Sequence, residues 1–322
     1  MFRSAALAAV LAGALLAGPT AAQAAPSSSQ SPVATPAQLP VPFDLGAGLR
    51  AMAFPETPPP GANDPNCRPS PQHPNPVVLV NPTFATQASA WQAGAPFLRN
   101  LGYCVYTFNF GNPTWISEIP IQGVGDIRQS AQVLSATVDR VLATTGATKV
   151  DLVGHSQGGG VLPGYYLNVL GGAAKVDRFV GVSPSNHGTT ASELAYVRSL
   201  VPPVGRAFYD ALGALAPALT QQAIDSDLMR QTYARGDTRP GVHYTTIVTK
   251  YDEVVTPYDQ QFLNGPDVTN ILLQDGCPSD RSEHLSTLYS ERVWLFVANA
   301  LDPAHATAVP CFEVDPFFPN VR

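Results

Sequence analysis

The chain has 322 residues, of which 45% are hydrophobic and 13% are charged, with a formal net charge of −6. This length and apolar content support one large domain with a single core, or at most two small ones. The sequence contains no basic block or stripe, which argues against a nucleic-acid partner.

The first residues have the three parts of an export signal. A short segment with one positive charge, at Arg3, precedes an apolar stretch over residues 5–17 and an Ala-x-Ala cleavage pattern at residues 22–24. The apolar stretch is too short to span a bilayer comfortably, which favours a cleaved signal peptide over residues 1–25 rather than a membrane anchor. We therefore expect a secreted, extracellular protein with no stable membrane insertion.

The segment that follows is rich in Pro, Ser, Ala and Gln and has no apolar period. Residues 26–42 are predicted to be a flexible linker, and residues 43–76 to be irregular chain that wraps the surface. A regular pattern of strands and helices starts at Pro76, so one folded domain is expected over residues 43–322.

The four cysteines are Cys67, Cys104, Cys277 and Cys311. An even number in an oxidising compartment indicates two disulfides, although free buried thiols remain an alternative. Three pairings are possible, and we favour Cys67–Cys104 and Cys277–Cys311 because each bridge then stays within one half of the chain. Each would close a loop of about 35 residues, worth about 4 kcal/mol in the chain-entropy description. No cysteine or histidine spacing suggests a metal site.

Short apolar runs and amphipathic stretches then alternate along the chain. The predicted strands cover residues 77–80, 103–108, 149–153, 179–182, 242–248 and 268–273. The predicted helices cover residues 86–101, 125–145, 158–170 and 285–301, the last with Leu285, Leu288, Tyr289, Val293, Phe296 and Val297 facing inward. This alternation predicts an α/β fold whose mainly parallel sheet is covered by helices on both faces.

Residues 189–240 interrupt the alternation with Ala- and Leu-rich helical pieces cut by prolines and glycines. This segment is predicted to be a helical cap or lid over a site, with ordinary core helices as the alternative. The apolar residues that favour a cap are Leu194, Val197, Leu200, Phe208, Leu212, Leu215 and Leu219.

Gly-His-Ser-Gln-Gly at residues 154–158 fits the G-x-S-x-G pattern. The match follows a predicted buried strand and precedes a predicted helix, which is the context that a nucleophilic serine needs. Small residues two before and two after Ser156 allow a tight turn, which projects the hydroxyl above the carboxyl end of the sheet at a helix N-terminus. Ser156 is therefore the candidate nucleophile.

A serine nucleophile needs a base, and in this chain order the base comes last. His284 lies on a loop after the late strand 268–273 and just before a helix, which is where such a base belongs. His305, beyond the last helix, is the reserve candidate.

The acid that orients the base should lie at a strand end between Ser156 and His284. Asp252 follows the strand 242–248 after a few residues and is the preferred candidate. The rival carboxylates are Glu253, Asp259 and Asp267.

An oxyanion hole needs two backbone N–H donors. The residue after the nucleophile, Gln157, supplies one, and the loop after the first strand supplies the other. In that loop Pro82 has no N–H to donate, whereas Thr83 has one, and the Thr83 hydroxyl can add a third donor.

These pieces, in this order, resemble the secreted class 2 lipases of the α/β-hydrolase superfamily and, more distantly, the lipase B type. The resemblance runs from Pro76 to Cys311 and rests on the stretches PVVLVNPTF, LGYCVYTFNFG, VDLVGHSQGG and YDEVV and on the loop that reaches His284. One feature departs from the family pattern: Asn81-Pro82 stands where class 2 lipases usually have His-Gly.

The resemblance implies hydrolysis of acylglycerols and related lipophilic esters without a cofactor. The substrate could be met at a lipid–water interface. It places the nucleophile, acid and base on Ser156, Asp252 and His284, the oxyanion donors on Thr83 and Gln157, and bridged cysteines on Cys104 and Cys277. The residues expected to contact substrate are Phe84, Trp115, Ile116 and His155.

A monomer is expected, and four alternatives to a lipase stay open. The same triad could act on polyesters or peptide bonds, or it could transfer an acyl group to an alcohol. More remotely, the fold could serve as a non-catalytic binding protein.

Overall fold

The fold is described from a computed structural model of the chain, which describes residues 38–112, 121–191 and 204–316. Several predictions fall outside these ranges: the signal peptide over residues 1–25, most of the linker, the substrate contacts Trp115 and Ile116, and the cap residues Leu194, Val197 and Leu200. The side chain of Phe208 is also not described.

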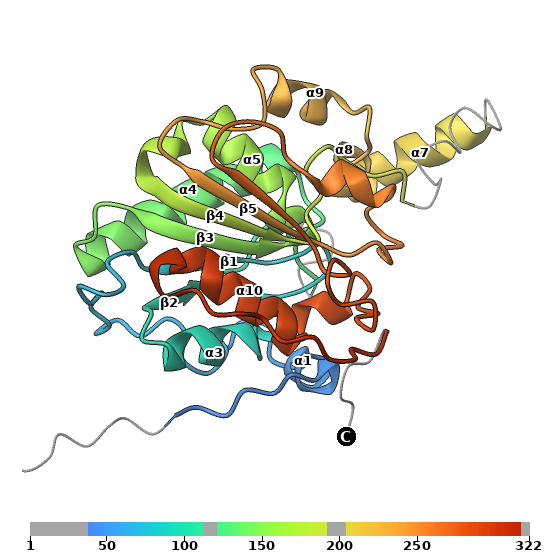
Figure 1. The fold of residues 1–322 in the computed structure, drawn as a ribbon. Helices are drawn as coiled ribbons and strands as arrows, with labels where there is room; N and C mark the ends of the chain where they lie inside the picture. The colour runs from blue at the N-terminus through green and yellow to red at the C-terminus, as the bar shows by residue number, and fades with distance from the viewer. Residues whose placement is uncertain (1–37, 113–120, 192–203, 317–322) are drawn as a thin grey trace, which may run out of the picture. The chain divides into compact units, whose positions relative to one another are not determined.

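The described part of the chain contains a six-stranded parallel sheet in the order β2-β1-β3-β4-β5-β6 (Figure 1). The strands are β1 (Val77–Val80), β2 (Val105–Thr107), β3 (Val150–His155), β4 (Val176–Val182), β5 (His243–Val248) and β6 (Val268–Leu272). Parallel pairing places the carboxyl ends of all six strands at one edge, where the loops that follow them meet. The predicted parallel α/β architecture is therefore confirmed.

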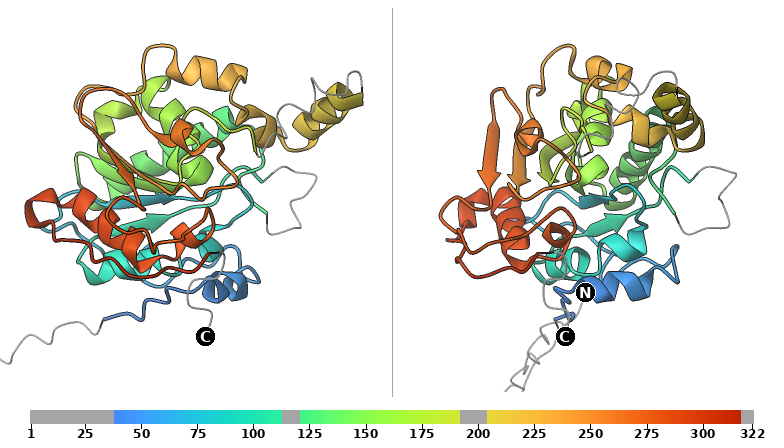
Figure 2. Two further views of the ribbon diagram at one scale, coloured as in Figure 1. Left: turned by 45° about the vertical axis from the view of Figure 1, so that its right-hand side comes forward. Right: turned by 90° about the vertical axis from the view of Figure 1, so that its right-hand side faces the viewer.

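Helices cover both faces of the sheet (Figures 1 and 2). Val78 and Val80 of β1 pack on the side of α4 and α5, whereas Val77 and Leu79 pack on the side of α3 and α10, so one strand contributes alternately to two cores. The α-helices are α1 (Leu45–Ala51), α2 (Gln87–Ala90), α3 (Gly94–Asn100), α4 (Ile127–Thr145), α5 (Val161–Asn168), α7 (Val204–Leu215), α8 (Pro217–Gln221), α9 (Asp227–Tyr233) and α10 (Glu291–Leu301).

The ends of α4 show why its prediction succeeds. The Asp126 carboxylate accepts hydrogen bonds from the amides of Arg128 and Gln129 at the first turn. Gly146 then ends the helix with a φ of 75°, a left-handed conformation that suits glycine.

Three local predictions are wrong. The predicted helix 86–101 is two helices, α2 and α3, because the chain leaves helical geometry at Trp91. The predicted helix 285–301 begins only at Glu291, where Ser290 caps α10, and a 3-10 turn precedes it. Leu285, predicted to face inward, is 49% exposed because it lies on that preceding loop.

The N-terminal region also differs from its prediction. Residues 43–76 were expected to be irregular, but they contain α1, whose N-cap Asp44 accepts a hydrogen bond from the amide of Gly46. Within the described ranges no helix has the length and apolar character needed to cross a membrane.

Both predicted disulfides are confirmed, as Cys67–Cys104 and Cys277–Cys311. The first ties the irregular N-terminal region to the start of β2. The second ties the loop after β6 to the segment beyond α10. The loop after β6 carries His284, so this bridge helps to fix the region in which the candidate base lies.

Candidate active site

Ser156 lies at the carboxyl end of β3 on the tight turn that the sequence predicts. Its φ is +56°, in the left-handed region that costs a residue other than glycine about 1–3 kcal/mol. A Cβ on Gly154 would lie 1.8 Å from the carbonyl oxygen of Gly158, and a Cβ on Gly158 would lie 2.2 Å from that of Val80. Only glycine fits at both positions, so the two glycines permit the close backbone approach that creates this turn.

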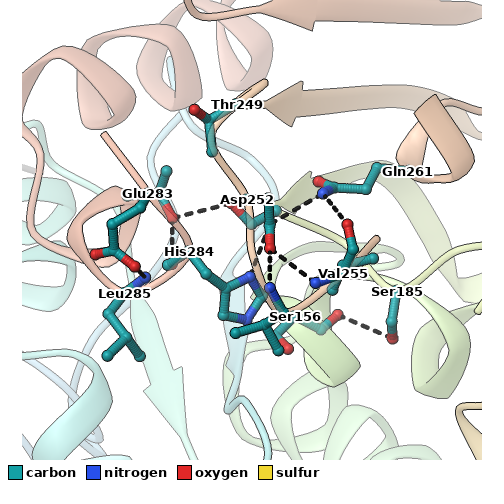
Figure 3. A network of polar contacts seen from close by, with 12 residues as sticks. Ser156, Ser185, Thr249, Asp252, Val255, Gln261, Glu283, His284 and Leu285 are labelled. Atoms are coloured by element: carbon teal, nitrogen blue, oxygen red, sulfur yellow. Dashed lines mark hydrogen bonds and ion pairs between the residues drawn. The ribbon is translucent and has the colours of Figure 1, made fainter. Parts of the chain in front are cut away.

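His284 and Asp252 form a buried hydrogen-bonded pair (Figure 3). The His284 Nδ1–H donates to Asp252 Oδ2 over 2.8 Å, while Asp252 Oδ1 accepts from the amides of Val254 at 2.9 Å and Val255 at 2.7 Å. Burial alone would raise the pKa of Asp252, but the charge and hydrogen bond of His284, with the two amides, lower it. The carboxylate therefore stays ionised and fixes which nitrogen of the imidazole carries the proton.

Gln261 is a member of this network that the sequence analysis missed. Its Nε2 donates to Asp252 Oδ2 at 2.9 Å and to the carbonyl of Val255 at 3.1 Å. The side-chain amide of Asn186 donates to the carbonyl of Gln261 over 2.5 Å, and Gln261 is fully buried. No motif marks Gln261 in the sequence; the only available signal is that a buried carboxylate needs donors for both of its oxygens.

His155, predicted to contact substrate, is fully buried against the loop of the candidate base. Its Nε2–H donates to the carbonyl oxygen of His284 over 2.7 Å, and the two rings lie 4.8 Å apart. Burial, followed by the charge of His284, lowers the pKa of His155 to about 3, so the ring is neutral. The side chain thus holds the His284 backbone in place.

Thr83 and Gln157, the predicted oxyanion donors, are joined by their side chains. Gln157 Nε2 donates to Thr83 Oγ1 at 2.9 Å and to the carbonyl of Gly123 at 2.7 Å. Gln222, which follows α8, donates to the same Thr83 Oγ1 at 3.0 Å. Two amide donors therefore occupy the acceptor sites of the Thr83 hydroxyl, which leaves its proton free to donate.

Asn81, at the position that departs from the family pattern, anchors the loop before Thr83. Its Nδ2 donates to the carbonyl of Phe108 at 2.9 Å, and its Oδ1 accepts from the indole N–H of Trp91 at 2.6 Å. Asn81 is fully buried, so these hydrogen bonds act where water cannot compete. The loop thus has a fixed backbone with an asparagine in place of the usual histidine.

Ser156, His284 and Thr83 line one cavity of about 560 Å³. No hydrogen bond joins the Ser156 hydroxyl to the imidazole among the contacts of the described residues; the two side chains share the cavity. Phe84, predicted to contact substrate, also lines it and is 53% exposed. The described part of the predicted cap contributes Leu212 to the same cavity.

The reserve candidate base, His305, is exposed and bonds to Asp302, which caps the same 3-10 turn. A further histidine, His187, is half-buried and pairs with Asp237. Across residues 38–112, 121–191 and 204–316, no group of three or more His, Cys, Asp or Glu side chains is arranged to hold a metal ion.

Comparison with known proteins matches residues 74–290 to the family described as Lipase (class 2). Over 235 residues the chain is 26% identical to lipase B of Pseudozyma antarctica, an alignment that covers 70% of this chain and 61% of that protein. The chain thus spans about three fifths of the length of this relative.

Two solved lipases share the fold. Lipase B of Aspergillus fumigatus has a TM-score of 0.58 and 23% identity, covering 79% of this chain and 57% of that one. The mature form of lipase BlEst2 from Bacillus licheniformis has a TM-score of 0.53 and 19% identity, covering 74% of this chain and 96% of that one. Because the family match spans most of the sequence and the fold agrees, the chain belongs to the class 2 lipases of the α/β-hydrolase fold.

Proposed function

We propose that the protein is a secreted serine ester hydrolase that acts through an acyl-enzyme on Ser156. The observation that carries this proposal is the position of Ser156, on a strained turn, beside the same cavity as the hydrogen-bonded pair of His284 and Asp252. Membership of the class 2 lipases supports ester hydrolysis as the reaction.

In the first half of the reaction, Ser156 Oγ attacks the ester carbonyl carbon while His284 Nε2 takes the hydroxyl proton. The backbone N–H groups of Thr83 and Gln157, with the Thr83 hydroxyl, bind the oxyanion. The bond to the alcohol oxygen then breaks, and His284 returns the proton to that oxygen. Water, activated by the same imidazole, cleaves the acyl-enzyme in the second half.

Asp252 holds the imidazole tautomer and stabilises the imidazolium that forms. Attack requires a neutral imidazole, so activity should fall on acidification. Because the pKa of Asp252 is lowered, its own protonation does not cause this fall. A flat pH–rate profile down to pH 4 would contradict the assignment of His284.

The cavity supports a lipophilic ester, such as an acylglycerol, as the substrate. Large apolar side chains that line it remain exposed, among them Leu49, Phe84, Val254 and Leu285. Such an exposed apolar lining suits contact with a lipid–water interface. The described cap residues Leu212 and Leu219, which also line the cavity, are proposed to form part of the acyl-binding wall.

Two disulfides support export to an oxidising compartment, where such bridges persist. We place the mature protein outside the cell, as a monomer that needs no cofactor. Size-exclusion chromatography of protein recovered from the culture medium tests export and the monomeric state. Sequencing of its N-terminus tests whether the signal peptide is cleaved.

The catalytic assignment is tested with Ser156→Ala. The wild-type protein should react with a fluorophosphonate probe and hydrolyse nitrophenyl esters, whereas Ser156→Ala should take up no probe and lose rate by about 10⁴–10⁶-fold. If Ser156→Ala kept the full rate, Ser156 would not be the nucleophile. A wild-type protein that neither binds the probe nor cleaves esters would instead indicate a binding protein.

A further inference from the structure

Helix α1 contributes a wall to the catalytic cavity. Leu45, Leu49 and Met52 line the cavity together with Leu285, which follows the candidate base. The family match covers only residues 74–290 and so does not include α1. The N-terminal helix is therefore a part of the site for which the family match gives no role.

The position of α1 is fixed by close packing. A Cβ on Gly48 would lie 1.9 Å from Tyr289 Oη and 2.6 Å from the carbonyl oxygen of Ser89, so the helix backbone rests directly on these groups. Tyr289 Oη also donates a hydrogen bond to that Ser89 carbonyl. Preceding α1, the backbone of Leu39 makes two hydrogen bonds of 2.8 Å to the side chain of Asn100.

On this fixed helix, apolar side chains remain in contact with water. Leu49 is 55% exposed and Met52 is 37% exposed, although both border the cavity. Leu285, which follows the candidate base and also lines the cavity, is 49% exposed. A hydrocarbon group that enters here would cover the three side chains and remove their apolar surface from water.

The cavity has two sides, and α1 lies on the side of the candidate base. Helix α1 shares the face of the sheet that α3 and α10 cover, whereas α8 lies on the face of α4 and α9 (Figures 1 and 2). Tyr289, on which α1 rests, follows His284 by only five positions in the sequence. Leu219 and Ala223, from α8 and the chain that follows it, line the opposite side.

The chemistry distinguishes the two sides. In the first half-reaction the proton on His284 passes to the oxygen of the leaving alcohol, so that oxygen must lie within hydrogen-bond reach of the imidazole. The alcohol portion of the ester therefore lies toward the α1 side. The acyl chain, bound through the same carbonyl carbon, extends toward α8.

We propose that α1 and Leu285 form a binding subsite for the alcohol portion of the substrate, and that this subsite selects alcohols that carry a hydrocarbon chain. An alcohol of this class would be the diacylglycerol that leaves a triacylglycerol. This inference rests on the proposed function of Ser156 and His284 and adds a substrate preference to it.

The test varies the alcohol and the acyl group separately, using dissolved monomeric substrates. Ethyl to octyl acetates change only the alcohol, and nitrophenyl butyrate to octanoate change only the acyl chain. In Leu49→Gln the ratio of kcat/KM for octyl acetate to that for ethyl acetate should fall about tenfold. The ratio of kcat/KM for nitrophenyl octanoate to that for nitrophenyl butyrate should keep its wild-type value.

Leu170→Gln is the matched control, because Leu170 is 39% exposed and follows α5, at the opposite end of that helix from Ser156. Both ratios should be unchanged in this variant. An unchanged acetate ratio in Leu49→Gln, or an equal or larger fall in the nitrophenyl ratio, would overturn the subsite. Failure of the wild-type protein to hydrolyse either series would overturn the proposed function and the subsite with it.

Discussion

Two histidine–aspartate pairs in the described part of the chain, one buried and one half-buried, differ in their surroundings, and only the buried pair borders the cavity that contains Ser156. His284 bonds to Asp252 over 2.8 Å, and His187 bonds to Asp237 over 3.1 Å. Each pair joins loops that are distant in the sequence. Judged by residue types and distance alone, the two pairs are nearly the same.

The difference lies in the second ring nitrogen. The Nδ1 of His187 faces the carbonyl oxygen of Gln260 at 3.0 Å, so both of its ring nitrogens face acceptors. In His284 only Nδ1 is engaged; its Nε2 bonds to no described residue, and the ring lines the cavity that contains Ser156. A general base needs one nitrogen held by the acid and the other open to the substrate, which only His284 has.

The electrostatics of His187 agree with a structural role. Burial alone would lower the pKa of His187, but the hydrogen bond and charge of Asp237 outweigh burial and raise it. The same contact lowers the pKa of Asp237. The pair is therefore a charged link between the loop after β4 and the chain that follows α9.

The same substitution at both histidines gives the largest expected contrast. His284→Gln should lower kcat by about 10⁴–10⁶-fold, because no group then accepts the Ser156 proton. His187→Gln should keep kcat near the wild-type value, because its ring does not line the cavity. Nitrophenyl ester hydrolysis by the two folded variants measures this contrast, and comparable losses at both positions would remove the distinction.

A smaller effect is expected from Gln261, which donates to the same Asp252 oxygen as His284. Gln261→Met retains the volume but removes the donor, so the carboxylate holds the imidazolium proton more tightly. We expect kcat/KM to fall about tenfold and the acidic limb of its pH profile to move to higher pH.

The control for Gln261→Met is Gln260→Met, at the neighbouring and less buried position. This variant should have the wild-type pH profile. A fall in rate for Gln261→Met with no movement of the acidic limb would indicate a packing role only.

The smallest expected effect is a change in thermal stability at His187. Because the pKa of His187 is raised on folding, its stabilisation is full below about pH 6.5 and is lost as the pH rises through the raised value. His187→Gln should therefore lower Tm by about 2–4 °C at pH 5.5 and by less at pH 8.5. Equal shifts in Tm at the two pH values would show that the charge of the pair does not stabilise the fold.

Much of the site follows from local sequence. The turn at Ser156 was predictable because glycines flank the serine at the two positions where a Cβ would strike backbone atoms. Asp252 was preferred over Glu253 as the acid, and it is Asp252 that bonds to His284. Ser156 and Asp252 each follow the end of a strand, and parallel strands bring their carboxyl ends to one edge of the sheet. Their positions after strands therefore predicted that both residues lie at that edge.

Other features had no local signal. Nothing near Gln261 indicates that its amide reaches Asp252, and His155 reads as a neighbour of the nucleophile rather than a support for the His284 backbone. The prediction for Leu285 was wrong for a related reason. Helical spacing predicted that it faces inward, but the chain before α10 is not helical and leaves the side chain exposed.

The sequence alone determined most of the order of strands and helices along the chain and the turn at Ser156, because these depend on apolar periodicity and on glycine positions. The sequence favoured one of three cysteine pairings, and the structure has that pairing. Only the tertiary structure decided that Gln261 bonds to Asp252 and Gln222 to Thr83. It also decided that α1 lines the cavity. Those contacts join segments far apart in the chain or lie on loops without a period. Their partners are fixed by how the sheet and its helices pack, and no local pattern records that packing.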